Sequence, residues 1–564
     1  MPKHLLASCV GIAALLASHA AFAAGIEGYY RQPTLRGDVI IFVAEGDLWK
    51  VSLTSAQSPT GAVATRLTSH AGEEGSPRIS PDGSTVAFTA QYEGPTDIYT
   101  MPVSGGLPTR LTWDGNARAT VAGWTPPDAK GHARVMATTN RFSSLPNVQL
   151  TLIDPATAAR EVVPLAQASD GLFAPDGHTL FFTRIPFNGS FTKRYKGGTI
   201  QQLWKFDTAQ QNEATGLTTD YPGTSYAPMW WNDRVYHLSD RDNTMELWSM
   251  DPSGKDLKQL TDHASLGVPY LDAKGPALDN GHIVYQLGAD LWCIDLASSK
   301  TTKLGIRLDS DFDQMRERWV KKPFDYLTAA HISPDGEHVA ITARGTIFVA
   351  PKQQGRLIEV PRVGAARNRD ARFMPDGSLL TILDQTGETE FWTLPANGVD
   401  AAAKSTQITS DSTVLRFEGT PSPDGKFIAA FDKDQRVFLV DVAAKSSKQI
   451  DADNWDLPAD FTWSSDSKWI AYAVHGANQN LQVKLYSIES GTSVAVTTDR
   501  FQSYAPAWSA DGKWLYFLSD RTLKSDVGSP WGPMAPEPHF DNMTKAYALA
   551  LKPGQRWPLA PDDE

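Results

Sequence analysis

Short apolar runs separated by turn residues recur along the whole chain. The best-preserved copy has the turn Ser80-Pro81-Asp82-Gly83, followed by apolar runs at residues 86–88 and 97–99. Proline presets φ at the second position of such a turn, aspartate bonds back to the backbone, and glycine takes the positive φ that closes a hairpin. Short runs rich in β-formers and bounded by turns predict buried β-strands.

Two independent patterns show that this unit is repeated. The turn recurs at residues 174–177, 333–336, 374–377, 422–425 and 509–512, with a degenerate copy at 464–467. A polar residue followed by an aliphatic and then usually an aromatic residue recurs at 47–49, 97–99, 149–151, 202–204, 246–248 and 290–292. The second pattern has a spacing of about 44 to 53 residues, which is typical of the blades of a β-propeller.

The repeats fall into two groups, and together they predict an all-β chain. Six repeats end near residue 304, so we expect a six-bladed β-propeller over residues 24–308. The charged stretch 309–326 interrupts the pattern and predicts a linker. Five further turn copies predict a second β-propeller over residues 327–564, with about five blades visible. Five blades could in principle close a small ring, because propellers of four to eight blades exist.

The first residues indicate export. Lys3 and His4 precede an apolar stretch that is too short to span a bilayer, and Ala21-Phe22-Ala23 offers a small-residue cleavage site. We therefore predict a signal peptide at residues 1–23, a periplasmic or secreted protein, and no membrane span after cleavage; a disordered or buried first strand is the alternative. Cleavage would leave Cys293 alone, and its strand pattern predicts a buried, inert thiol.

Charge and motifs exclude several classes of function. The net charge of −12 and the lack of a basic block argue against nucleic acid. Neither a Gly-x-Ser-x-Gly elbow nor a His-Glu-x-x-His motif occurs. Asp309, Asp311 and Asp313 have the spacing of a calcium loop, but Gln314 and Val320 stand where that loop needs glycine and glutamate. We expect no metal and no cofactor, while a catalytic triad assembled only by folding stays an alternative.

One polar insertion stands out within the fourth repeat. Residues 191–199 combine basic and aromatic side chains in the order Phe-Thr-Lys-Arg-Tyr-Lys-Gly-Gly-Thr. From composition alone the segment is a solvent loop or, alternatively, a loop that lines a channel or an interface.

Three segments together give the chain a specific resemblance. They are Arg194-Tyr195-Lys196-Gly197-Gly198-Thr199 followed by Leu203-Trp204, the opening 33–38 with Gly46-Asp47-Leu48-Trp49, and Leu518-Ser519-Asp520-Arg521. This combination resembles tricorn protease and its bacterial homologues over nearly the whole chain after the signal. Propellers of the TolB kind share the turn repeat but lack the insertion.

The resemblance implies a fold and a function. In that family a six-bladed propeller precedes a seven-bladed one, followed by a PDZ domain and the domain with the serine nucleophile. The chain would then stop about two blades short, as a non-catalytic part that gates substrates or conducts products of an exported serine oligopeptidase. Its implied partners are peptides, the missing PDZ and catalytic region or a separate chain that carries it, and further copies of the full-length protein. The family anchors the carboxyl terminus of a peptide with two adjacent arginines in the third blade, and here Arg118 alone matches.

Two other classes of function remain. The chain could be a stand-alone periplasmic scaffold of the TolB kind that binds protein partners, or the propeller of an enzyme like prolyl oligopeptidase, which normally has one propeller. Closure of the second propeller distinguishes a truncated peptidase from a complete scaffold. We expect this propeller to be open, whereas pairing of the last strand with residues 324–330 would argue for a complete scaffold.

Overall fold

The fold is taken from a computed structural model of the chain. It describes residues 26–115, 118–145, 147–186, 194–266, 271–312, 317, 319–364, 366–524, 540, 542–557 and 559–561. The chain divides into two compact units, Met1–Arg318 and Trp319–Glu564. The predicted signal peptide lies outside the described residues.

Within the described residues, the first unit contains six sheets in chain order, each built on an antiparallel four-stranded core. Their strands are β1 (Arg31–Arg36), β2 (Val39–Ala44), β3 (Asp47–Ser52) and β4 (Ala62–Arg66); β5 (Glu74–Ile79), β6 (Thr85–Ala90), β7 (Asp97–Pro102) and β8 (Thr109–Arg110); β9 (Ala119–Trp124), β10 (Val135–Thr139), β11 (Gln149–Ile153) and β12 (Arg160–Val162); β13 (Ser169–Phe173), β14 (Thr179–Thr183), β15 (Leu203–Asp207) and β16 (Thr215–Gly216); β17 (Ser225–Trp231), β18 (Arg234–Ser239), β19 (Glu246–Met250) and β20 (Lys258–Gln259); β21 (Ala273–Asp279), β22 (His282–Leu287), β23 (Asp290–Asp295) and β24 (Lys300–Lys303). The short helix α2 (Leu53–Ala56) follows β3.

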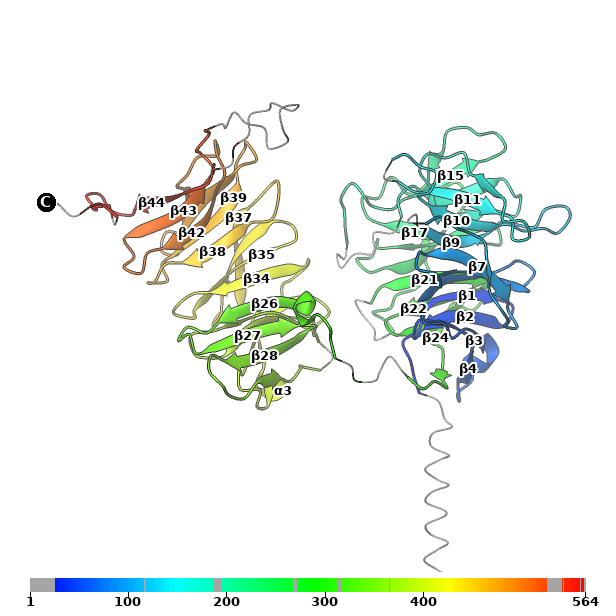
Figure 1. Cartoon of the computed structure of the whole chain (residues 1–564), viewed down its shortest axis with the longest axis horizontal. Helices are drawn as coiled ribbons and strands as arrows, with labels where there is room; N and C mark the ends of the chain where they lie inside the picture. Colours follow the sequence, from blue (N-terminus) through cyan, green and yellow to red (C-terminus); the bar gives the residue numbers. More distant parts are fainter. Residues whose placement is uncertain are drawn as a thin grey trace, which may run out of the picture. The chain divides into compact units, whose positions relative to one another are not determined.

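The six sheets form a ring, because the sixth packs against the first (Figure 1). Phe42 and Trp49 of the first sheet share a buried core with Val284 and Leu291 of the sixth. The extra strand β25 (Ile306–Leu308) adds to the first sheet by parallel pairing with β4. Each sheet therefore buries both of its faces, which a single four-stranded sheet cannot do alone.

The turn predicted from the sequence forms as expected. Ser80 Oγ donates to Asp82 Oδ1 at 2.5 Å, and Gly83 has a φ of +77°. The Thr85 N–H then donates to Ser80 Oγ at 3.0 Å, which fixes the start of β6. The same serine–aspartate contact recurs at the turns that begin with Ser333, Ser422, Ser464 and Ser509.

A buried carboxylate at the start of the third strand of several sheets explains the second sequence pattern. Asp97 accepts hydrogen bonds from Thr112 Oγ1 and from Arg110 Nη2, both at 2.6 Å. Thr112 Oγ1 also accepts the Ile98 N–H at 2.9 Å, so it fixes the start of β7. The pairs Glu246–Thr261 and Glu390–Thr409 repeat this contact. The recurrent polar residue is therefore a structural element of the blade.

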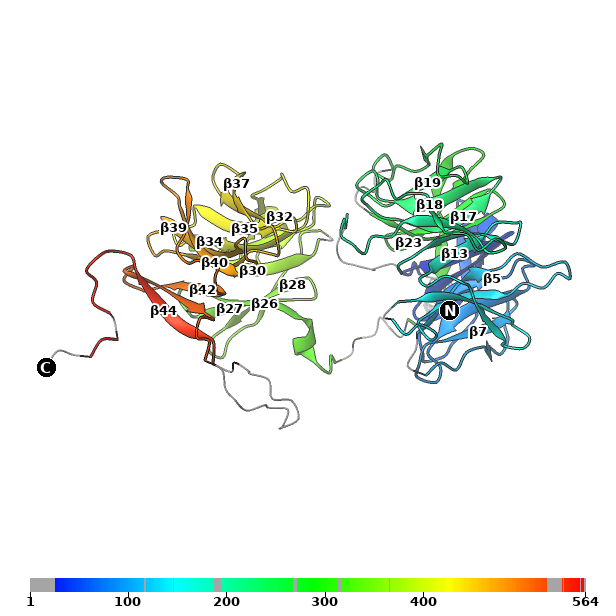
Figure 2. The same cartoon turned by 90° about the horizontal axis from the view of Figure 1, so that it is seen from above.

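The described part of the second unit contains five sheets in chain order (Figure 2). Their strands are β26 (Leu327–Ile332), β27 (His338–Ala343), β28 (Thr346–Pro351) and β29 (Ile358–Val360); β30 (Asn368–Phe373), β31 (Leu379–Leu383), β32 (Glu390–Leu394) and β33 (Thr406–Gln407); β34 (Arg416–Pro421), β35 (Phe427–Asp432), β36 (Arg436–Asp441) and β37 (Ser446–Ala452); β38 (Ala459–Trp463), β39 (Trp469–His475), β40 (Leu481–Ser487) and β41 (Ser493–Ala495); β42 (Ser503–Trp508), β43 (Trp514–Ser519) and β44 (Lys545–Ala550). The short helices η2 (Pro323–Tyr326) and α3 (Ala401–Lys404) precede β26 and β33.

Core clusters join each sheet of the second unit to the next, from the first sheet to the fifth. Among the described residues no such cluster joins the fifth sheet to the first. Ile332 in β26 is 71% exposed, whereas Leu35 in β1, the innermost strand of the first unit's first sheet, is 5% exposed. Among the strands that the structure describes, β44 pairs only with β43, and no pairing of this last strand with residues 324–330 is seen.

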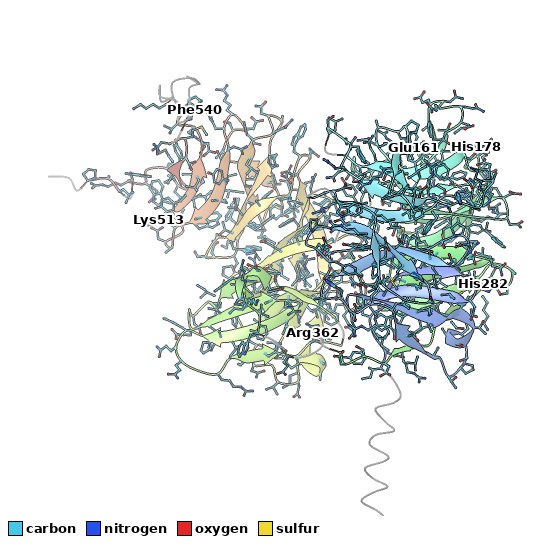
Figure 3. All side chains as sticks on the ribbon, turned by 45° about the vertical axis from the view of Figure 1, so that its right-hand side comes forward. Glu161, His178, His282, Arg362, Lys513 and Phe540 are labelled. Atoms are coloured by element: carbon cyan, nitrogen blue, oxygen red, sulfur yellow. The ribbon has the colours of Figure 1, made fainter. Side chains whose placement is uncertain are left out.

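Neighbouring sheets are joined near their innermost strands by polar contacts as well as by apolar packing. The indole N–H groups of Trp124 and Trp463 each donate to a carbonyl of the preceding sheet, at 2.9 Å. Most innermost strands have a bulge at which one residue has a positive φ. In several of them the N–H of this residue donates to a side chain of the preceding sheet. Gln32 accepts the Ser76 N–H at 2.7 Å, and Asp170 accepts the Ala227 N–H at 2.6 Å. Side chains fill the space between the sheets of each unit (Figure 3).

The prediction of an all-β fold with six and then five blades is confirmed. The sequence did not predict β25 as a fifth strand of the first sheet, and it did not show that the fifth sheet of the second unit has three described strands. No helix in the described part of the chain has the length and apolar character needed to cross a bilayer.

Candidate functional site

One end of the first ring collects the loops that the sequence marks as unusual. In an antiparallel four-stranded sheet, the connection between the second and third strands lies at the same end as the connection to the next sheet. The connections β8–β9, β10–β11, β12–β13 and β14–β15 therefore share one end of the ring, which we name the insertion face. A hydrogen bond between two of these connections supports this placement: Arg184 Nη2 of β14–β15 donates to Gln167 Oε1 of β12–β13 at 3.1 Å.

Arg118 lies on the insertion face, directly before the innermost strand β9 of the third sheet. Its side chain is exposed, and its backbone N–H donates to Asn140 Oδ1 at 2.9 Å. This bond ties the β8–β9 connection to the β10–β11 connection. The structure therefore places Arg118 where the innermost strand leaves the face, with its guanidinium exposed.

A second arginine lies close to Arg118 along the neighbouring loop. Arg141 follows Asn140 directly, and its side chain is 58% exposed. Its Nε is 4.0 Å from Asp114 Oδ1, but both oxygens of Asp114 are already bonded to Arg160 Nη1, at 2.6 and 2.9 Å. Arg141 is therefore held loosely. The sequence pattern does not indicate this arginine, because it is 23 positions from Arg118 in the chain and adjacent to it only through a loop contact.

The polar insertion of the fourth sheet lies on the same face. Residues 187–193 are outside the described part, but Arg194 to Gln202 are described within the β14–β15 connection. Thr199 Oγ1 donates to the Tyr195 hydroxyl at 3.0 Å, and Lys196 is exposed. Gln201 is buried, and its carbonyl accepts the Ser225 N–H of the next sheet at 2.8 Å. The insertion is thus anchored at its carboxyl end.

Two opposite charges lie on innermost strands of the first ring. Arg78 in β5 donates through Nε to the Ala122 carbonyl of the next sheet, at 3.2 Å. Burial lowers the pKa of its guanidinium, and the charge of Asp170 in β13 acts in the opposite direction. Burial likewise raises the pKa of the Asp170 carboxyl, against the bond from Ala227 and the charge of Arg78. The interior of this ring therefore holds ionisable groups that the sequence pattern did not indicate.

The innermost strands of the second unit carry a continuous polar network that sequence reasoning also missed. His331 Nε2 lies 2.7 Å from Asp370 Oδ1, and Arg372 Nε donates to Asp370 Oδ2 at 3.1 Å. Arg372 continues to Glu418 Oε2 at 2.9 Å. Burial raises the pKa of Asp370, but the bond to His331 and the charge of Arg372 outweigh it and leave the pKa below its usual value. The network spans three sheets, so only folding brings it together.

Histidine–carboxylate pairs occur, but no catalytic triad is found in the described ranges. His263 Nδ1 is 2.8 Å from Glu246 Oε2, and its Nε2 faces the Tyr285 hydroxyl at 3.0 Å, deep in the core. His475 Nδ1 is 2.8 Å from Asp453 Oδ2. Within the described residues, neither ring has a hydrogen bond to a serine, threonine or cysteine side chain. Cys293 is buried, and burial raises the pKa of its thiol to about 12, so the prediction of an inert thiol agrees with its surroundings.

The calcium-like spacing before the second unit does not form a described metal site. Asp311 approaches Arg66 Nη1 at 3.8 Å, and Asp313 lies outside the described residues. Among the residues that the structure describes, no group of three or more histidine, cysteine, aspartate or glutamate side chains could hold a metal ion.

Six sheets in a ring followed by five more, with a basic insertion on one face of the ring, define a tandem β-propeller protein. The family described as "Tricorn protease N-terminal beta propeller domain" matches residues 27–300, and "Tricorn protease second beta propeller domain" matches residues 327–564. The chain therefore belongs to the tricorn protease family, of which it carries these two propeller domains. This confirms the resemblance seen in the sequence.

Individual relatives agree with the family match. The chain is 29% identical over 505 residues to "Tricorn protease homolog 1" of Streptomyces coelicolor, covering 88% of this chain and 45% of that protein. It matches the structure "Crystal structure of the tricorn protease" with a TM-score of 0.51 and 22% identity, covering 94% of this chain and 50% of that one. The chain thus spans about half the length of these relatives.

Two shorter relatives come from Sulfurisphaera tokodaii. The chain is 28% identical over 183 residues to a "Putative Tricorn-like protease N-terminal subunit", covering 32% of this chain and 86% of that protein. It is 27% identical over 297 residues to a "Putative Tricorn-like protease C-terminal subunit", covering 52% of this chain and 33% of that protein. In that organism, tricorn-like sequence similar to this chain is thus present on two polypeptides.

Proposed function

We propose that this chain is the non-catalytic, substrate-guiding part of an exported tricorn-like serine oligopeptidase. The observation that carries the proposal is the match of two propeller domains, in order, to a peptidase family whose members are about twice as long. The absence of a triad from the described residues fits a division of labour. In this proposal the chain selects and conducts peptides, and other residues cleave them.

The first ring is the entrance in this proposal. Arg118 stands at the insertion face beside the start of β9, where an exposed guanidinium can pair with the free carboxylate of a peptide. The innermost strands would then form the wall of the path. Arg78 and Asp170 place polar, ionisable groups in that wall, which would favour peptide groups over apolar segments.

The catalytic residues belong to a partner in this proposal. The two Sulfurisphaera tokodaii subunits support a separate chain, because both are similar to parts of this one. Residues 1–23 would export the chain to the periplasm or the medium, and the complete peptidase would be a homo-oligomer. The molecular mass of the mature chain in solution, measured with and without the partner, tests whether the two chains associate and whether the complex is a homo-oligomer.

Peptide hydrolysis tests the proposed function directly. Short fluorogenic peptides are incubated with the purified chain, with the protein encoded immediately downstream, and with the mixture. Activity in the mixture that exceeds the sum of the two separate samples is expected. Hydrolysis by the chain alone would overturn the proposal. A lack of activity in every sample, together with tight binding of a periplasmic protein, would favour a binding scaffold instead.

A narrowed ring gives a second test. Thr120 is an exposed residue of the innermost strand β9, and Thr120→Trp adds bulk there. The proposal expects slower hydrolysis of long peptides than of dipeptide-sized reporters in the mixture. Thr157→Trp, at an exposed outer turn, is the matched control. An equal effect of both substitutions would argue against passage through the first ring.

A further inference from the structure

Four arginines lie together at one end of the first two sheets of the second unit. Arg344 occupies the β27–β28 connection, and Arg362 (Figure 3) and Arg367 occupy the β29–β30 connection. Arg369 lies at the start of the innermost strand β30. The order of the strands places these connections at the same end of the sheets, and all four side chains are exposed. We name these four residues the arginine cluster.

Direct contacts hold the two connections of the cluster together. Arg362 Nη2 donates to the Arg344 carbonyl at 3.1 Å. The Asn368 N–H donates to the Gly345 carbonyl, also at 3.1 Å. A Cβ added to Gly345 would lie only 3.3 Å from the Cβ of Arg367. Two connections from neighbouring sheets therefore pack against each other, and their arginines share one surface.

Acidic side chains compensate only part of the charge of the cluster. Asp384 pairs with Arg367, with 3.0 Å between Oδ2 and Nε. Within the described residues, no carboxylate forms an ion pair with any of the other three arginines. Asp384 and Glu388 are the only acids described in the connections β27–β28, β29–β30 and β31–β32. A chain with a net charge of −12 thus gathers an excess of positive charge at this place.

The proximity of like charges affects Arg369 in particular. Partial burial lowers the pKa of its guanidinium, and the charge of Arg367 lowers it further. The charges of Asp384 and Asp370 act in the opposite direction. Each of these carboxylates already bonds another arginine, Asp370 through Oδ2 to Arg372 Nε at 3.1 Å. Repulsion within the cluster is therefore a cost that a bound anion would remove.

An exposed aromatic ring adjoins the cluster. The Arg344 guanidinium lies over the ring of Tyr326 in η2, 5.2 Å from its centroid. Tyr326 is 46% exposed, and Phe324 is 84% exposed. An arginine that stacks on an aromatic ring keeps the N–H groups at its edge for other partners. The cluster thus combines cations with exposed apolar surface, as expected of a site for a ligand that carries both anionic and apolar groups.

We infer that the arginine cluster binds peptides through their aspartate and glutamate side chains, with Arg362 and Arg369 pairing with the carboxylates. This inference rests on the proposed function and adds to it a substrate class and a peptide-binding surface on the second unit. Arginine suits the task because its planar guanidinium bonds both oxygens of a carboxylate. Since Arg369 belongs to an innermost strand, a peptide held there lies beside the inner side of the sheets.

Peptide binding to the whole chain tests the inference. Two hexapeptides are labelled at the amino terminus and amidated at the carboxyl terminus, one with two glutamates and the other with two glutamines in their place. Fluorescence anisotropy should show that the glutamate peptide binds about tenfold more tightly at low salt. This difference should shrink as sodium chloride is added, because salt screens pairs between exposed charges.

Matched variants locate the effect. Arg362→Gln and Arg369→Gln should each weaken binding of the glutamate peptide by about threefold, and the double variant should remove its advantage over the glutamine peptide. Arg356→Gln removes an exposed arginine from the β28–β29 connection, at the opposite end of the same sheet, and should change nothing. Thermal unfolding checks that each variant is folded. If loss of the bond to the Arg344 carbonyl destabilises Arg362→Gln, then Arg369→Gln alone decides the result.

The outcomes distinguish this inference from the proposed function. Equal binding of the two peptides, or unchanged binding in Arg369→Gln, overturns the inference, while hydrolysis in the mixture can still be observed. If inorganic phosphate displaces the glutamate peptide and sodium chloride of equal ionic strength does not, the cluster is a phosphate site and the inference is likewise overturned. Glutamate-dependent binding that Arg369→Gln weakens supports the inference, even where the mixture shows no hydrolysis and the proposed function fails.

Discussion

A buried histidine in the fifth sheet allows a sharp test of how the blades are stabilised. His237 in β18 is fully buried, and neither ring nitrogen has a hydrogen-bond partner among the described residues. Phe42, Phe88 and Phe182 occupy the corresponding position in β2, β6 and β14, each opposite an aromatic residue of the third strand. His237 lies opposite Trp248 in the same way. We therefore expect His237→Phe to be accepted by the core.

The effect of His237 on the free energy of unfolding follows from the protonation of its ring. Burial, with a smaller contribution from the Arg241 charge, lowers the pKa of His237 from 6.5 to about 3. Below pH 6.5 the unfolded chain therefore binds a proton at His237 that the folded chain does not bind. The free energy of unfolding consequently falls as the pH decreases. Between pH 7.5 and pH 5 this group removes about 2 kcal/mol, because only the unfolded state is protonated over that interval. The figure barely depends on how far below 5 the folded pKa lies.

Urea unfolding of the parent and of His237→Phe at the two pH values measures this effect. At pH 7.5 the gain from removing two unsatisfied nitrogens, about 1–3 kcal/mol, is offset by a cost of similar size for the larger ring. At pH 5 the variant should be more stable than the parent by about 2 kcal/mol beyond the difference at pH 7.5. His132→Gln, at an exposed turn, is the control and should show no such change. An identical difference between variant and parent at both pH values would refute the reasoning.

Three further predictions concern packing and exposure. Trp463→Phe removes the bond to the preceding sheet and should lower the free energy of unfolding by about 1–2 kcal/mol, whereas Trp455→Phe, at a 51% exposed site, should leave it unchanged; equal losses would show that the bond is not the cause. Ile332→Ala should change stability by less than about 0.5 kcal/mol, and Leu35→Ala should cost about 2–4 kcal/mol; a large loss in both would mean that the face of β26 is covered in solution. Cys293, in a background whose other cysteine is serine, should react with Ellman's reagent only after unfolding, and rapid reaction of the native chain would contradict its burial.

The sequence predicted the blades because each blade is a local structure. The Ser-Pro-Asp-Gly turn, the short strands beside it and the polar residue at the start of the third strand all lie within one repeat. Asp97 and Thr112 are 15 residues apart, so their contact belongs to one hairpin and leaves a periodic trace in the sequence. The number of sheets in each unit followed from counting these traces.

Contacts between sheets left no such trace. His331, Asp370 and Glu418 come from three successive sheets of the second unit. Arg372 links Asp370 to Glu418, and this chain of contacts forms only because the innermost strands are neighbours. Arg141 lies near Arg118 through a hydrogen bond from the backbone of one loop to the side chain of another. No spacing along the chain encodes either arrangement. The residues that make up the candidate site could therefore be identified only from the three-dimensional structure. The boundaries of the predicted domains and the role of Arg118 stay predictions.

The uncovered face of the first sheet of the second unit has a consequence for how that unit unfolds. In the first unit every sheet has a neighbour on both sides, so removing one sheet exposes two faces at once and the whole ring should open together. In the second unit the first and fifth sheets each have one neighbour within the described chain, and stability along such a linear stack is the sum of each repeat and its contacts. Amide protons of β27 and β43 should then exchange sooner than those of β35, so that loss of structure begins at both ends and moves inward.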